Sequence, residues 1–154
     1  MKRIEVKLSL PVVAPLLDVI KEMGGDLQRS LAAPLAIGDL EAEFHGSWVE
    51  ELLTAQNEDV RILLALFNEE FFSEGVIAID EENAEHVVRA CAAVRLSLRA
   101  RHLQSLDEET LEGGEVALDQ LAEPTRKAFM CYLFLATLQE LIIQHLDESI
   151  LDAG

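Results

Sequence analysis

The chain has 154 residues, of which 50% are hydrophobic, and it carries 29 Asp and Glu against 12 Lys and Arg, a net charge of −17. This length corresponds to a single domain over residues 1–154, and the hydrophobic content argues against intrinsic disorder. The acidic surplus repels phosphate groups, so nucleic acids and anionic membranes are disfavoured as partners.

A half-buried strand is predicted at the N-terminus, where residues 3–10 alternate between polar side chains and apolar ones such as Ile4 and Val6. A lone strand needs a partner, and residues 75–79, GVIAI, form a short β-branched run. We expect these two segments to pair as a small two-stranded ribbon packed on helices.

Helical spacing of apolar side chains recurs from residue 11 to residue 72. We predict helices over 11–23, 26–33, 39–55 and 57–72, the third with a break at Gly46-Ser47. The pair Gly24-Gly25 is expected to end or kink the first helix, because adjacent glycines interrupt helices.

Two more helices are predicted in the second half of the chain. Asp80 stands before a first turn of acids, so we expect a helix to begin there and to run to Leu103, with cations in its last turns. Pro124 suits the first turn of the last helix, which is expected to end at Asp147 or Ser149.

The last helix contains the most apolar run of the chain, FMCYLFLATLQELII at residues 129–143. A helix with so small a polar face is buried in a core or spans a membrane, and a span needs roughly 18–20 apolar residues. The run is shorter and includes Gln139 and Glu140. We therefore predict a mainly α fold, a single-domain helical bundle around a buried C-terminal helix. The N-terminus lacks the apolar stretch of a signal peptide, so we expect a cytoplasmic protein.

Motifs of catalysis and cofactor binding are absent from the sequence. It contains no glycine-rich phosphate loop, GxSxG, HExxH or Cys/His cluster, so we name no catalytic residue, cofactor or metal ligand. Cys91 and Cys131 are expected to be buried core thiols, with a redox pair or disulfide as the alternative. A metal or small-ligand site would need His45, His86 or His145 to converge with acids, and His45 and His86 each follow a Glu by four residues.

The most suggestive local feature is a basic stripe in the helix that ends at residue 103. Arg95, Arg99 and His102 stand at i, i+4 and i+7 and so share a face, with Arg101 beside them. One interpretation is internal pairing with acids such as those of residues 104–123, a segment with seven acids and no Lys or Arg. The other is a docking site for an acidic partner or a phosphate.

Aromatic side chains give a second candidate surface. Phe71 and Phe72 are consecutive, so one inner helix face cannot hold both rings. The second ring is expected to cover the ribbon or to mark an exposed interface used in dimerisation. Trp48 is expected to anchor the core.

Two stretches carry a family resemblance. The first, AEHVVRACAAVRLSLRARHL at 84–103, has an Arg-rich end, and the second, RKAFMCYLFLATLQELIIQHL at 126–146, closes with Leu-Gln-Glu-Leu. With the alternating N-terminus, they resemble the bacterial domain-of-unknown-function family numbered two-thousand-and-seventeen. The resemblance implies no established enzymatic activity. It also implies a regulatory or proteostasis setting, because actinobacterial members often lie beside the gene for the Clp-protease adaptor. Redox roles proposed for members rest on closely spaced cysteines, a spacing that this chain lacks.

These observations favour a cytoplasmic helical protein that acts by contact with a protein partner or by self-association, in a regulatory and non-enzymatic role. One alternative is a metal- or small-ligand-binding helical protein. The other is a transcriptional regulator that touches DNA directly, which the net charge opposes.

Overall fold

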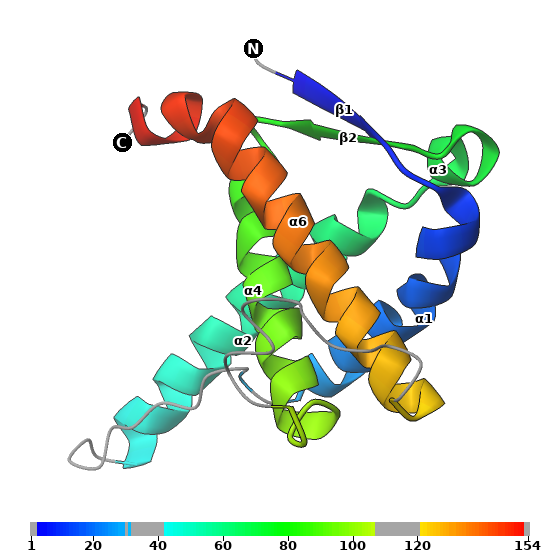
Figure 1. The fold of residues 1–154 in the computed structure, drawn as a ribbon. Coiled ribbons are helices and arrows are strands. Elements are labelled where there is room, and N and C mark those ends of the chain that lie inside the picture. The colour runs from blue at the N-terminus through cyan, green and yellow to red at the C-terminus, as the bar shows by residue number, and fades with distance from the viewer. Residues whose placement is uncertain (1–2, 30, 32–41, 107–120, 153–154) are drawn as a thin grey trace.

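The computed structural model describes residues 3–29, 31, 42–106 and 121–152, with the backbone alone for 42–47 and 146–152. Its elements in chain order are β1 (Arg3–Lys7), α1 (Leu10–Leu27), α2 (Ala42–Ala65), α3 (Glu69–Glu74), β2 (Val76–Asp80), α4 (Ala84–Arg101) and α6 (Glu123–Asp152). Helices α4 and α6 run side by side, α1 packs across both, and α2 packs on α4 (Figure 1). The predicted mainly α bundle is therefore confirmed.

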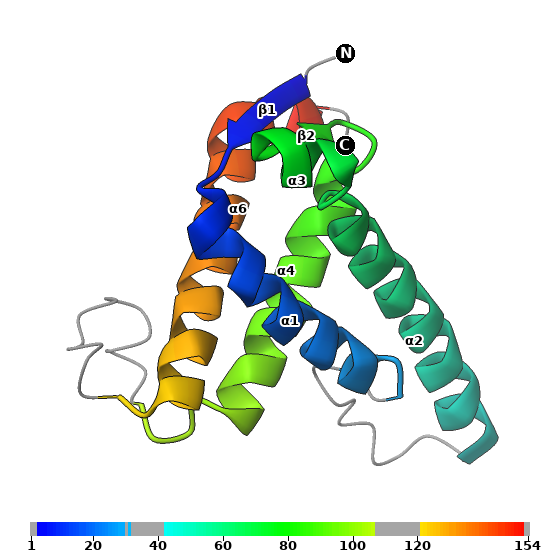
Figure 2. The ribbon, with the colours of Figure 1, turned by 90° about the vertical axis from the view of Figure 1, so that its right-hand side faces the viewer.

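The predicted ribbon is also present. Strands β1 and β2 pair antiparallel, with Ile4 opposite Ile79 and Val6 opposite Ile77, and they lie across one end of the helices (Figure 2). The turn before β2 depends on Gly75, whose φ of 73° is left-handed and whose added Cβ would lie 2.7 Å from the carbonyl oxygen of Leu8. Glycine is the residue that adopts this conformation without strain.

The prediction that Gly24-Gly25 would interrupt the first helix is wrong. Helix α1 continues through both glycines to Leu27. A Cβ on Gly24 would meet the side chain of Val60 at 3.1 Å. This glycine therefore permits the close approach of α2, a long-range reason that the local sequence does not reveal.

The helix boundaries predicted between residues 39 and 72 are also wrong. Helix α2 is continuous through Gly46-Ser47 and past residue 57, and it ends at Ala65 instead of running to residue 72. The break comes at Asn68, whose side chain accepts a hydrogen bond from the backbone N–H of Phe71 at 3.3 Å and caps the short α3. The N-terminal part of the predicted third helix lies outside the described residues.

Asp80 does not begin a helix as predicted, but closes β2. Its carboxylate accepts hydrogen bonds from the backbone N–H of Glu82 at 2.9 Å and of Asn83 at 3.0 Å, while the Asn83 side chain accepts from the N–H of Asp80. This reciprocal turn satisfies the polar groups between strand and helix, and α4 begins at Ala84.

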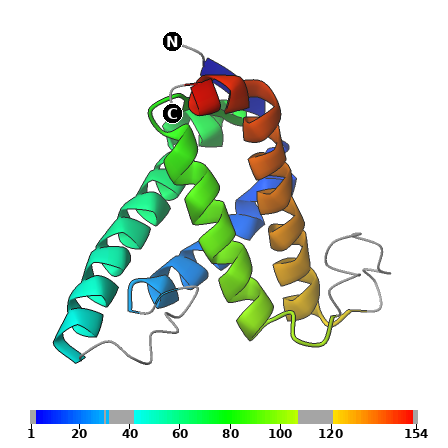
Figure 3. The same ribbon diagram turned by 90° about the vertical axis from the view of Figure 1, so that its left-hand side faces the viewer.

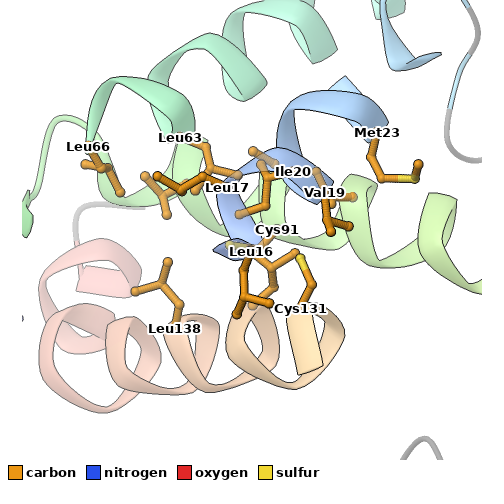
Figure 4. Close-up of a cluster of buried hydrophobic side chains, with 14 of the residues drawn as sticks. Leu16, Leu17, Val19, Ile20, Met23, Leu63, Leu66, Cys91, Cys131 and Leu138 are labelled. Carbon is orange, nitrogen blue, oxygen red and sulfur yellow. The ribbon is translucent and has the colours of Figure 1, made fainter. Parts of the chain in front are cut away.

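The core lies between α1, α2, α4 and α6. Figure 4 shows Leu16 and Ile20 of α1 among Leu63 of α2, Cys91 of α4 and Leu138 of α6, all of them buried. By length and composition the segment Glu123–His145 could cross a membrane. In the fold it packs against α4 and α1, as predicted for a central C-terminal helix.

Candidate functional site

The basic stripe of α4 begins at Arg95, which lies against α6. Its guanidinium donates hydrogen bonds to the Gln139 Oε1 at 2.7 Å and the Tyr132 hydroxyl at 3.1 Å, and it lies 4.5 Å from the centre of the Tyr132 ring. The Gln139 amide in turn donates to the carbonyl oxygen of Val88 at 3.0 Å. Gln139, a polar interruption of the apolar run, therefore completes a polar clamp between α4 and α6.

Two other members of the stripe, Arg101 and His102, lie near α1. Arg101 forms an ion pair with Asp26 of α1 at 3.4 Å, and Arg99 also has an interaction partner. His102 caps the C-terminal end of α4. The stripe is therefore engaged within the molecule by neutral groups of α6 and by an acid of α1. Residues 107–120, which hold most of the acids expected to pair with it, lie outside the described residues.

A pocket of about 310 Å³ opens where the C-terminal end of α4 meets α1 and the start of α6. Its ionisable lining residues come from all three regions and comprise Asp18, Glu22, His102, Glu123 and Lys127. Three carboxylates against one lysine give the pocket an acidic lining. A small ligand that fits this lining carries amino groups.

A buried carboxylate joins α2 to α4. Asp59 is 6% exposed and accepts hydrogen bonds from Arg89 at 3.0 and 3.1 Å, while its Oδ1 lies 2.8 Å from the Nδ1 of His86. Arg89 also pairs with Glu85 at 2.8 Å, and the interaction with Asp59 raises its pKa. Sequence reasoning missed this cluster, because 27 and 30 positions separate its members.

Cys91 and Cys131 are both buried free thiols, as predicted. Burial raises the pKa of each to about 12, and the positive charge of Arg95 offsets only part of this effect at Cys91. The thiolate is the nucleophilic and metal-binding form of cysteine, and at neutral pH these groups are thiols. Their surroundings fit a packing role.

The structure buries one of the two phenylalanines predicted at an interface and exposes the other. Phe71 is completely buried and packs edge-on against Phe67, with ring centres 5.2 Å apart, whereas Phe72 is 52% exposed. The interface prediction therefore concerns Phe72 alone.

The expectation that Trp48 anchors the core is wrong, because this side chain on α2 is 52% exposed. Leu52, one turn further along α2, is 40% exposed, and Leu96 of α4 is 42% exposed. The first buried residue of α2 after Trp48 is Asp59. The described N-terminal half of α2 thus presents apolar side chains that the body of the protein leaves uncovered.

The histidines do not converge in the part of the chain that the structure describes, where no three His, Cys, Asp or Glu residues are grouped to hold a metal ion. His86 contacts Asp59 instead of Glu82, and His145 lies beside β1. The side chain of His45 lies outside the described residues.

Fold and side chains together define a mainly helical domain with an acidic pocket, internal polar clamps and uncovered apolar side chains. Residues 27–146 match the family described as Domain of unknown function (DUF2017), so the chain belongs to that family. No curated protein and no solved structure matches the chain.

Proposed function

We propose that this protein acts in the cytoplasm by binding another protein, in a regulatory and non-enzymatic role. The observation that carries the proposal is the exposure of large apolar side chains on three different helices: Trp48 and Leu52 of α2, Leu96 of α4, Phe72 of α3. Single exposed apolar residues are ordinary, whereas neighbouring ones such as Trp48 and Leu52, one turn apart on α2, mark interaction surfaces.

A photo-crosslinking experiment in cells tests the proposal. A photoreactive amino acid replaces Leu52, Phe72, Leu96 or Ile143 in turn, and the exposed Glu82 serves as the polar control. We expect at least one apolar position to give a discrete adduct that the control position lacks. If none of the four apolar positions gives an adduct, the proposal is contradicted.

The basic stripe remains a predicted docking surface for an acidic partner. Charge reversal by Arg101→Glu breaks the ion pair with Asp26 but touches no residue of the α4–α6 clamp. If the stripe docks the partner, this variant loses the crosslinked adduct while its circular dichroism spectrum stays unchanged. An unchanged adduct would assign docking to another face.

The acidic pocket favours a second candidate function, the binding of a small amine. A diamine that occupies the pocket stabilises the native state by mass action and raises the unfolding temperature. The variant Glu22→Gln removes one lining carboxylate and reduces that rise, whereas Glu82→Gln, on a distant turn, leaves it unchanged. Equal rises in all three proteins would exclude specific binding in the pocket.

A further inference from the structure

Strand β1 has a free edge, and the register of the ribbon defines which backbone groups point to it. The N–H of Leu8 donates to the carbonyl oxygen of Gly75 at 2.7 Å, so residue 8 bonds toward β2. In an antiparallel pair, successive residues bond alternately toward the partner strand and away from it. The even-numbered residues of β1 therefore bond toward β2, and the odd-numbered ones direct their N–H and C=O groups to the free edge. The odd-numbered residues are Arg3, Glu5 and Lys7.

The side chain of Asn83 supports this assignment from the other strand. It donates to the carbonyl oxygen of Ala78 at 3.4 Å and accepts from the N–H of Asp80 at 2.9 Å. These two residues lie opposite Glu5 and Arg3, and their backbone groups also point away from the ladder. Asn83 thus occupies outward groups of β2, whereas no backbone hydrogen bond joins the outward groups of β1 to another residue that the structure describes.

A groove follows the free edge of β1 and is walled by α6. The cavity has a volume of about 370 Å³ and is lined by the four consecutive residues Ile4–Lys7, together with Leu141 and His145. Successive side chains of a strand point to opposite faces, so a cavity that touches four in a row lies along an edge of the strand. No residue of β2 lines it, which places it on the free edge. Figure 1 shows the ribbon and the C-terminal end of α6 at the same end of the molecule.

The charges of β1 limit which strands this edge accepts. Arg3 and Glu5 pair with each other at 3.7 Å, whereas the exposed Lys7 forms no ion pair with any residue that the structure describes. Charges on an edge strand oppose pairing with a strand that does not match them, and an opposite charge on a neighbouring strand is favourable. On the other face the aliphatic side chains of β1 are half-buried, and Leu141 extends this apolar wall.

We propose that the free edge of β1 binds an extended segment of a partner protein as a third strand. The partner's backbone bonds the outward N–H and C=O groups of β1. Its apolar side chains alternate along the segment and enter the groove against Leu141, and an acidic side chain on the other face lies next to Lys7. The proposal rests on the proposed function and names a binding site and a partner chemistry for it. The net charge of −17 opposes a second copy of this chain as the occupant.

Amide hydrogen exchange measured by NMR tests the proposal residue by residue. The probe is an end-blocked peptide of sequence VTVEVTV. In the free protein we expect fast exchange at the outward amides of Glu5 and Lys7 and slow exchange at the inward amides of Val6 and Leu8. Saturating peptide is expected to slow exchange at the outward amides. A fully N-methylated peptide of the same sequence has no backbone donor and is expected to give no protection, and VTVKVTV is expected to bind more weakly.

Variants locate the binding. Glu5→Pro removes an outward N–H but no bond to β2, a position at which an edge strand tolerates proline. We expect it to weaken the affinity for VTVEVTV about 10-fold, whereas Glu5→Ala, which keeps the N–H, does not weaken it. Lys7→Glu is expected to weaken the affinity roughly 5-fold, and it keeps the test valid if the proline variant does not fold. Lys21→Glu, the same change at an exposed lysine of α1, should leave the affinity unchanged.

Five results would overturn the proposal. They are no added protection at the outward amides, equal protection by the N-methylated peptide, and an unchanged affinity of Lys7→Glu. The fourth is outward amides that are already protected in the free protein, because another part of the chain would then cover the edge. The fifth is protection that rises with protein concentration in the absence of peptide, because a second copy would then be the occupant.

Crosslinking in cells separates this proposal from the proposed function. The photoreactive amino acid is placed at Lys7 in addition to the four apolar positions. An adduct at Lys7 supports both proposals. Adducts confined to the apolar positions keep the proposed function and overturn strand addition. Protection by VTVEVTV without an adduct at any position would support the edge as a strand-binding site and contradict the proposed function alone.

Discussion

At the scale of single residues, the two buried cysteines make the stability of the folded protein depend on pH in the alkaline range. Unfolded thiols lose their protons from an ordinary pKa of 9.0, whereas the buried Cys91 and Cys131 keep theirs up to about 12. Between these values the native state binds more protons than the unfolded state. The stabilising contribution is therefore complete below pH 9 and is lost as the pH rises toward 12.

We expect the free energy of unfolding to fall in this window by up to about 1.4 kcal/mol per pH unit for each thiol. Urea unfolding at about pH 8 and about pH 10.5 measures the fall. In the variant Cys91→Ala/Cys131→Ala the starting stability is lower because of the cavities, but the fall is smaller. An identical fall in both proteins would show that the buried thiols are not its source.

Asp59 gives the second prediction at this scale. Replacing it by Asn removes the charge that Arg89 and His86 face, and we expect the free energy of unfolding to drop by about 1–3 kcal/mol in denaturant titration. The neighbouring Glu58 pairs with Arg61 on the exposed surface, so Glu58→Gln is the matched control and should leave the midpoint unchanged. Equal effects of the two changes would contradict the buried role of Asp59.

At the scale of elements, the clamp of Arg95, Tyr132 and Gln139 fastens α4 to α6. The change Gln139→Ala removes one acceptor of Arg95 and the donor to Val88, and we expect a loss of about 1–2 kcal/mol in the free energy of unfolding. Thr137, also on α6, donates a hydrogen bond to the carbonyl oxygen of Leu133 in its own helix. The change Thr137→Ala should therefore cost less, and an equal cost would argue against the clamp.

Helices and strands could be predicted from the sequence where the pattern that determines them lies within the segment itself. The ribbon follows from alternation and the central α6 from its apolar run. The end of α2 and the continuity of α1 depend on contacts with distant residues, such as Gly24 against Val60, so local patterns placed them wrongly. Among the candidate site residues, the spacing of the basic stripe was readable. The partners of Arg95, 37 and 44 positions away, were not.

At the scale of the whole molecule, α2 separates from α4 toward its N-terminal end (Figure 3), and Trp48 in that part of α2 is 52% exposed. Trp48 was expected to be buried because a lone tryptophan is more often a core residue than a ligand-stacking one. The structure shows that no residue of α2 from Trp48 to Glu58 is fully buried and that the buried residues of this helix begin at Asp59. The exposed apolar side chains of α2 support the proposal that the protein binds a partner.

The most direct test of this account is quenching of Trp48 fluorescence by acrylamide, a neutral quencher that the acidic surface does not repel, in the free protein over a wide range of protein concentrations. The account predicts efficient quenching that is independent of protein concentration, because none of the residues that the structure describes covers Trp48, which is 52% exposed, and the net charge of −17 opposes self-association. A tryptophan that is shielded at every concentration, or that becomes shielded as the concentration rises, would contradict it.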